Sequence, residues 1–193
     1  LPRLFALAGL ALVVAVGPLV AGCAAIVIGA TAGVGTLVAM DRRSSGVLAS
    51  DQAIESKVTK DAANRWPSGV HLNVTSFDGK VLLTGEVPTA AIREEIGQLA
   101  TATEYVRGVN NELLVGPETE FGARTQDSYI TTKVKTRLIE AGRLDANNVK
   151  VVTERSVVYL LGLVSREEGA AAAGIAASTT DVARVVKLFE YTD

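Results

Sequence analysis

DQAIESKV at residues 51–58 and DSYITTKV at residues 127–134 decide the fold of this chain of 193 residues. The two stretches agree at four positions and are separated by an offset of 76 residues. The agreement continues downstream, where VLLTGEV at 81–87 resembles VYLLGLV at 158–164 with an offset of 77. An offset that stays nearly constant along the chain indicates a duplicated domain.

Each copy is predicted to have the element order α-β-β-α-β. Asp51 and Asp127 are predicted to be the N-caps of the first helices, because apolar residues follow them at helical spacing. The predicted class is α+β: in each copy a three-stranded mixed sheet packs on two helices that share one face. The later elements are expected at 70–77, 80–87, 89–103 and 109–115 in the first copy, and at 149–153, 157–164, 166–178 and 185–191 in the second.

The hairpin turns of the two copies are predicted to differ. Asp78-Gly79 in the first copy is a strong signal for a two-residue turn between antiparallel strands. The second copy has Glu154-Arg155-Ser156 at this place, without a glycine. We therefore expect its hairpin loop to be built in another way.

The N-terminal segment resembles a bacterial lipoprotein signal peptide. Arg3 precedes an uncharged apolar core, a glycine-proline breaker and LVAGC at 19–23, in which small residues stand before the cysteine. We predict a signal peptide over 1–22 and acylation of Cys23, since acyl chains contribute about 0.8 kcal/mol per buried CH₂. Ala24 favours the outer membrane, because an Asp there commonly signals retention in the inner membrane. The alternative is an uncleaved transmembrane helix with an incidental cysteine.

The rest of the chain divides into a tether, two domains and a linker. Residues 23–50 are predicted to be a lipidated tether rich in Gly and Ala, and residues 117–126 a linker between domains at 51–116 and 127–193. The small apolar residues 24–40 are at the short limit for a membrane span, so a tether close to the membrane is favoured over a span.

Two motifs of the repeat resemble BON domains. The V-x-L-x-G-x-V strands around Gly85 and Gly162 and the run VRGVNN at 106–111 carry the resemblance, although the second copy lacks the equivalent of Gly108. Together with the lipobox, the chain from about Cys23 to its C-terminus resembles the dual-BON-domain outer-membrane lipoproteins. This resemblance implies a location at the outer membrane facing the periplasm, and a role in envelope integrity.

The first helix of the second copy carries a predicted lipid-binding surface. Successive helix residues are about 100° apart, so its apolar positions face the core while Tyr129, Lys133 and Arg137 share an exposed side. Lys135 points in another direction from the helix axis and is included in the predicted surface as a further cation. An aromatic ring beside cations suits an anionic membrane surface. The first copy has Ala53 in place of Tyr129 and Asp61 in place of Arg137. The remaining predicted residues are Tyr129, Thr132, Lys133, Thr136 and Arg137.

The family resemblance supports this surface, because it implies that anionic phospholipid binds the first helix of the second BON domain, with Tyr129 as the aromatic. The residues alone leave open that Lys133 and Arg137 only solvate the helix face. A second function also stays open. The chain would then be a periplasmic scaffold for envelope proteins, for example the β-barrel assembly machinery that the resemblance implies.

The composition speaks against several other classes of protein. The formal net charge of -2 gives no reason to expect nucleic acid as a partner. One cysteine excludes an intrachain disulfide and argues against a cysteine-based zinc site. His71, the single histidine, is expected to be an ordinary strand residue, and no Walker loop, dinucleotide fingerprint or catalytic triad is present. We therefore expect no enzymatic activity, cofactor, metal or small-molecule substrate.

Overall fold

The computed structural model describes residues 42–142 and 145–193. The predicted signal peptide, Cys23 and most of the tether at 23–50 lie outside these residues. Within the described ranges, no helix has both the length and the apolar character that a membrane span requires.

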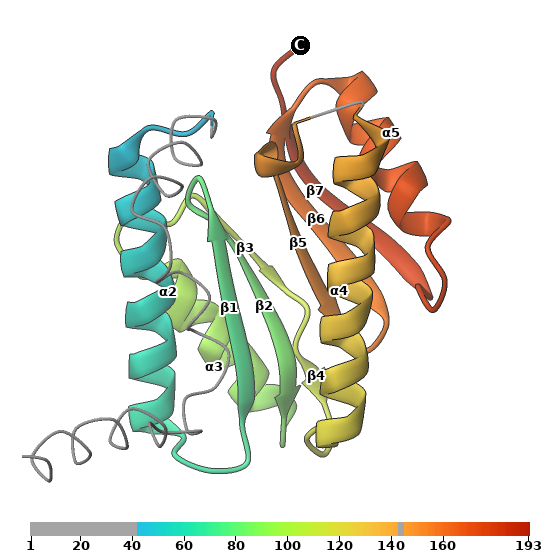
Figure 1. The fold of residues 1–193 in the computed structure, drawn as a ribbon. Coiled ribbons are helices and arrows are strands. Elements are labelled where there is room, and N and C mark those ends of the chain that lie inside the picture. The colour runs from blue at the N-terminus through green and yellow to red at the C-terminus, as the bar shows by residue number, and fades with distance from the viewer. Residues whose placement is uncertain (1–41, 143–144) are drawn as a thin grey trace, which may run out of the picture. The chain divides into compact units, whose positions relative to one another are not determined.

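The first domain folds as predicted, with a mixed sheet and two helices. Strand β1 is antiparallel to β2, and β3 and β4 are both parallel to β2. Helices α2 and α3 lie on one side of this sheet (Figure 1) and bury a shared apolar core that includes Ile54, Leu83 and Ile96. The elements are α2 (Ser45–Arg65), β1 (His71–Phe77), β2 (Lys80–Val87), α3 (Ala90–Thr101), β3 (Gly108–Asn111) and β4 (Leu114–Val115).

The second domain repeats this arrangement. Its sheet has the order β5-β6-β7, with β5 antiparallel and β7 parallel to β6. Helices α4 and α5 cover one face and bury Ile130, Leu160 and Ala172 in a second core (Figure 1). The predicted αββαβ order is thus confirmed in both copies. The elements are α4 (Phe121–Ala141), the 3₁₀ turn η1 (Ala146–Asn148), β5 (Val149–Glu154), β6 (Val157–Val164), α5 (Arg166–Ala177) and β7 (Arg184–Tyr191).

The first helix of each domain begins earlier than predicted. Ser44 caps α2, where its hydroxyl accepts a hydrogen bond from the Val47 amide at 3.3 Å. Helix α4 follows Glu120, which makes no side-chain cap. The prediction that Asp51 and Asp127 are N-caps is therefore wrong, since both lie inside helices and are buried.

Each of these aspartates instead binds the hairpin turn of its own domain. The Asp51 carboxylate accepts hydrogen bonds from the backbone amides of Asp78 and Gly79 at 2.8 and 2.9 Å. The Asp127 carboxylate accepts from the amides of Arg155 and Ser156, both at 2.8 Å. In each domain one buried carboxylate is thus the hydrogen-bond acceptor for two backbone amides of the turn, which would otherwise lack a partner.

The two hairpins have the same turn, so the predicted difference between them is also wrong. Asp78 and Gly79 have φ values of 50° and 73°, and Arg155 and Ser156 have φ values of 50° and 61°. A left-handed conformation costs about 1–2 kcal/mol for a residue with a Cβ. The hydrogen bonds from both turn amides to Asp127 offset this cost.

The last strand of the first domain, predicted as continuous over 109–115, is interrupted. Between β3 and β4 the chain turns Leu113 into the core, where it is fully buried. The Asn111 side chain accepts from the Leu113 amide at 3.3 Å and donates to the Arg93 carbonyl at 2.8 Å. The interruption therefore buries one more leucine and links the sheet edge to α3.

The helix-free faces of the two sheets share a third apolar core. Successive strand residues point to opposite faces of the sheet. Val81 and Leu83 therefore point to the face covered by helices, and Leu82 points to the other face. Leu82 is buried in one cluster with Leu161 and Tyr159 of β6. Burial, with the nearby Glu112 carboxylate, raises the pKa of the Tyr159 hydroxyl to about 12. Both faces of each sheet are thus covered.

Candidate membrane-contact site

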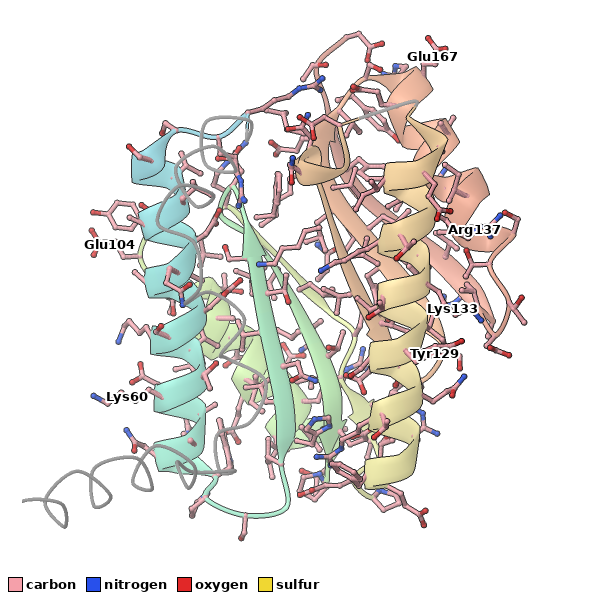
Figure 2. All side chains as sticks on the ribbon, in the orientation of Figure 1. Lys60, Glu104, Tyr129, Lys133, Arg137 and Glu167 are labelled. Atoms are coloured by element: carbon pink, nitrogen blue, oxygen red, sulfur yellow. The ribbon has the colours of Figure 1, made fainter. Side chains whose placement is uncertain are left out.

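Helix α4 presents the predicted site because its opposite side is fixed in the core. Ile130, Val134 and Leu138 are fully buried, and this directs the residues between them outward. Figure 2 shows Tyr129, Lys133 and Arg137 following one another along α4.

Tyr129 and Lys133 form an exposed pair of aromatic ring and cation. Tyr129 is 57% exposed, and the Lys133 ammonium lies 5.0 Å from the centre of its ring. The same ammonium forms an ion pair with Asp181 at 3.1 Å and donates to the Thr180 carbonyl at 3.3 Å. These contacts hold the cation beside the ring, at the outer side of the helix.

Arg137 forms hydrogen bonds within the second domain. Its guanidinium donates to the Thr179 hydroxyl at 2.7 Å and to the Ile175 carbonyl at 3.2 Å. Ile175 lies in the last turn of α5, whose carbonyl groups lack partners within the helix. Arg137 therefore joins α4 to the end of α5, and its charge reaches solvent only in part.

The structure separates Lys135 from the other predicted residues. Lys135 lines a cavity of about 330 Å³ that is also lined by Arg43, Phe77 and Lys150. Thr132 and Thr136, by contrast, are exposed on the same side of α4 as Tyr129. The predicted set thus forms one surface around Tyr129 and one cation on the far flank of the helix.

Two large apolar side chains of this surface are not among the predicted contact residues. Phe121 is 84% exposed and Ile139 is 68% exposed. At about 100° per residue, both lie about 80° from Tyr129 on the same side. Phe121 stands eight residues before Tyr129. This spacing predicts the same side of the helix for both residues once the predicted helix begins at Phe121 instead of Asp127. We call the resulting surface the α4 stripe: Phe121, Thr125, Tyr129, Thr132, Thr136 and Ile139.

The equivalent helix of the first domain lacks such a surface. Helix α2 contains no exposed large apolar side chain. Lys57, the counterpart of Lys133, forms an ion pair with Asp61 at 2.8 Å within the same helix. The two domains thus differ on this helix while sharing a fold.

Comparison with known proteins identifies the repeat. The BON domain family matches residues 50–117 and 126–193. The outer membrane lipoprotein DolP of Haemophilus influenzae is 40% identical over 176 residues, which cover 89% of this chain and 90% of that protein. The 21 kDa hemolysin of Actinobacillus pleuropneumoniae is 35% identical over 156 residues, or 79% of each chain.

Similarity to solved structures is weaker. The C-terminal domain of CdsD from Chlamydia trachomatis is 11% identical with a TM-score of 0.31, over 72% of this chain and 96% of that one. The expectation of a lipoprotein that is not an enzyme agrees with the relationship to DolP. The chain belongs to the BON domain family, as a protein with two BON domains that is related to the DolP lipoproteins.

Proposed function

We propose that this chain is an outer-membrane lipoprotein that faces the periplasm, binds anionic phospholipid through α4 of its second BON domain and helps maintain the envelope. The relationship to the outer membrane lipoprotein DolP supports the location. Acylation of Cys23, which lies outside the described residues, would supply the permanent anchor. Helix α4 would supply a second, reversible contact.

The observation that carries this proposal is the α4 stripe. Three of its side chains, Phe121, Tyr129 and Ile139, are large, apolar and mostly exposed. Phe121 and Ile139 are 18 residues apart, or about 27 Å at a rise of about 1.5 Å per residue. A helix with such a face lies in the plane of the membrane interface and buries its apolar side chains there.

The charges beside the stripe favour an anionic surface. Lys133 lies on one flank and Lys135 on the other, and each cation near such a membrane contributes about 1 kcal/mol. A lipid phosphate would replace Asp181 as the partner of Lys133. Since Asp127 is buried, Glu140 is the one exposed acid of α4. Its charge opposes binding at the end of the helix near Ile139.

Vesicle binding tests the proposal. A chain with Cys23→Ser avoids acylation, so a difference in binding to phosphatidylglycerol vesicles between its surface variants reports the contribution of the substituted side chain. Lys133→Glu changes the charge by two units, which at about 1 kcal/mol each predicts binding about 30-fold weaker. Lys57→Glu, at the equivalent place in α2, is the matched control and should leave binding unchanged. Equal effects of the two variants, or none, would favour the periplasmic scaffold that binds envelope proteins.

The anchor is tested separately by membrane fractionation. An acylated Cys23 predicts that Cys23→Ser moves the protein from the membrane fraction to the soluble fraction at low content of anionic lipid. An uncleaved transmembrane helix predicts that the same variant stays in the membrane at full length. Radiolabelled acyl donor should label only the chain that retains Cys23.

A further inference from the structure

Glu154, at the end of β5, is a buried carboxylate, and Arg124 lines the same cavity without forming an ion pair with it. Its residue is 7% exposed. Among the described residues its one hydrogen-bond donor is the neutral Asn73 amide, at 2.9 Å, and no Lys or Arg forms an ion pair with it. An ionised carboxylate in such a place is expensive to bury unless a cation compensates it.

Two further side chains of types that can bind a metal ion, Glu86 and His71, lie beside Glu154. Glu86 on β2 is 1% exposed, and its carboxylate is 2.9 Å from Nδ1 of His71 on β1. One donor atom of each of the three residues lies within 4.8 Å of the other two. All three stand on strands, so their positions are fixed by sheet pairing.

We propose that His71, Glu86 and Glu154 bind a divalent transition-metal ion such as Zn²⁺. One imidazole nitrogen and two carboxylate oxygens are an accepted ligand set for this ion, at bond lengths of about 2.0–2.2 Å. Such bonds place tetrahedral ligand atoms roughly 3.4 Å apart. Ligand atoms up to 4.8 Å apart would therefore approach by up to roughly 1.4 Å, through rotation of the glutamate side chains.

The Asn73 side chain contacts two of the proposed ligands. Its amide nitrogen lies 2.9 Å from Oε2 of Glu154 and 3.4 Å from Nε2 of His71, so a polarised donor already bridges the two groups. Rotation of this amide would turn its oxygen inward as a further ligand. A cavity of about 210 Å³, lined by His71, Asn73 and Glu154 among others, gives the ion a route from solvent and room for a bound water.

Other groups prepare Glu86 to act as a ligand. The Glu86 carboxylate accepts hydrogen bonds from the Thr119 hydroxyl and, at 3.2 Å, from the Thr119 backbone amide. Arg155, which is half exposed, lies 3.5 Å from the same carboxylate. Thr119 thus orients the Glu86 carboxylate as outer partners orient metal ligands.

The three ligands are departures from the repeat. At an offset of 77 residues, Asn148 stands for His71 and Leu163 for Glu86 in the second copy. Glu154 of the second copy replaces Phe77 of the first. The fold is therefore formed without these side chains elsewhere in the same molecule, and the set occurs once. A bound ion would join the first domain to the second.

Calorimetric titration with Zn²⁺ tests the site. The full chain would be purified in detergent without a histidine tag, stripped with a chelator and titrated with zinc chloride. We expect saturable binding of a single ion and a rise of the melting temperature on loading. His71→Gln and Glu154→Gln should each weaken binding by about 100-fold or more and abolish that rise. Glu190→Gln, another partly buried carboxylate, is the matched control and should bind normally.

Circular dichroism would show that each variant is folded, and if one variant fails to fold the other decides. A visible spectrum of the Co²⁺ form should show ligand-field bands in the wild type and lose them in the folded variant. The proposal is overturned by weak, non-saturable Zn²⁺ binding. It is equally overturned by saturable binding that folded His71→Gln and Glu154→Gln chains retain, because surface carboxylates would then be responsible. The three residues would in either case be a hydrogen-bonded cluster at the domain junction.

Discussion

Asp51 shows how much one buried charge does in this fold. Burial raises the pKa of its carboxyl, but hydrogen bonds from Gly79, Ser76 and Asp78 and the ion pair with Arg43 lower it below its ordinary value. The hydrogen bond from the Ser76 hydroxyl is 2.6 Å long and the ion pair with Arg43 is 2.8 Å. One side chain thus joins helix α2, the hairpin and the segment before the helix.

Asp51→Asn should lower the free energy of unfolding by about 2–3 kcal/mol at pH 7, since bonds to a charged acceptor are lost. A carboxyl whose folded pKa is depressed stabilises the protein above its unfolded pKa, near 3.8. That stability is lost as the pH falls through the folded pKa. Urea denaturation should therefore show a difference between wild type and variant that shrinks below pH 3.8. Asp61→Asn, at a half-buried acid of the same helix that pairs with Lys57, is the control. An equal loss at both pH values would contradict the assignment.

The second hairpin allows a stabilising substitution. Ser156→Gly removes a Cβ from a residue with φ of 61° and should raise the free energy of unfolding by about 1 kcal/mol. The reverse change in the first hairpin, Gly79→Ala, should destabilise by more, because its Cβ would overlap the Tyr105 carbonyl oxygen. Thermal denaturation of both variants measures the two effects, and a destabilising Ser156→Gly would contradict the strain argument.

The glycine of the repeated strand motif was recognised in the sequence, but its physical reason appears only in the structure. A Cβ on Gly85 would overlap the carbonyl oxygen of His71, and a Cβ on Gly162 would overlap that of Asn148. Both contacts join residues that are paired or adjacent across strands. Such a close approach depends on strand register, which a sequence pattern does not state.

At the scale of elements, helix α4 shows what the sequence could and could not predict. Its apolar spacing at Ile130, Val134 and Leu138 correctly predicts a helix and its buried side. The first residue of the helix could not be predicted, because Glu120 makes no side-chain cap and polar residues follow Gly116-Pro117. The sequence therefore places the first turns of α4 in the predicted linker, and Phe121 is absent from the predicted site.

The apolar ends of the α4 stripe should contribute to membrane binding. Phe121→Ala and Ile139→Ala should each weaken binding to phosphatidylglycerol vesicles by about 1–2 kcal/mol, since each removes buried apolar area. Neither variant should change stability, because both side chains are exposed in the free protein. Leu114→Ala, an exposed apolar residue of the first domain, is the control. Unchanged binding of the two α4 variants would exclude an interfacial helix.

Removal of the Glu140 charge should strengthen membrane binding. Glu140→Gln should strengthen binding to anionic vesicles about fivefold, because about 1 kcal/mol of repulsion is removed. The gain should disappear at high salt, where charges are screened. Sedimentation at two ionic strengths measures both effects, and a gain that persists in high salt would contradict the electrostatic explanation.

At the scale of the whole molecule, the shared core of Leu82, Tyr159 and Leu161 makes the two domains interdependent. Strand β6 has a nearly continuous apolar run, as strands buried on both faces do. Its sequence therefore indicates that something covers the second face of its sheet. It does not identify the cover, because contacts between distant strands leave no local pattern.

Leu161→Ala should destabilise both domains. Truncation of a buried leucine costs about 2–5 kcal/mol, and this one packs against residues of the first domain. Hydrogen exchange should show lower protection in β2 as well as in β6. Leu160→Ala, which truncates the core of the second domain alone, is the matched control. A loss of protection confined to the second domain in both variants would mean that the sheets do not stabilise each other.

The central claim is that the second domain meets the membrane through α4, and chemical-shift mapping tests it most directly. The ¹⁵N-labelled chain with Cys23→Ser would be titrated with phosphatidylglycerol micelles and, as a control, with phosphatidylcholine micelles. The account predicts shifts centred on residues 121–139 with phosphatidylglycerol and much smaller ones with phosphatidylcholine. Shifts spread evenly over both domains, or centred on α2, would contradict it.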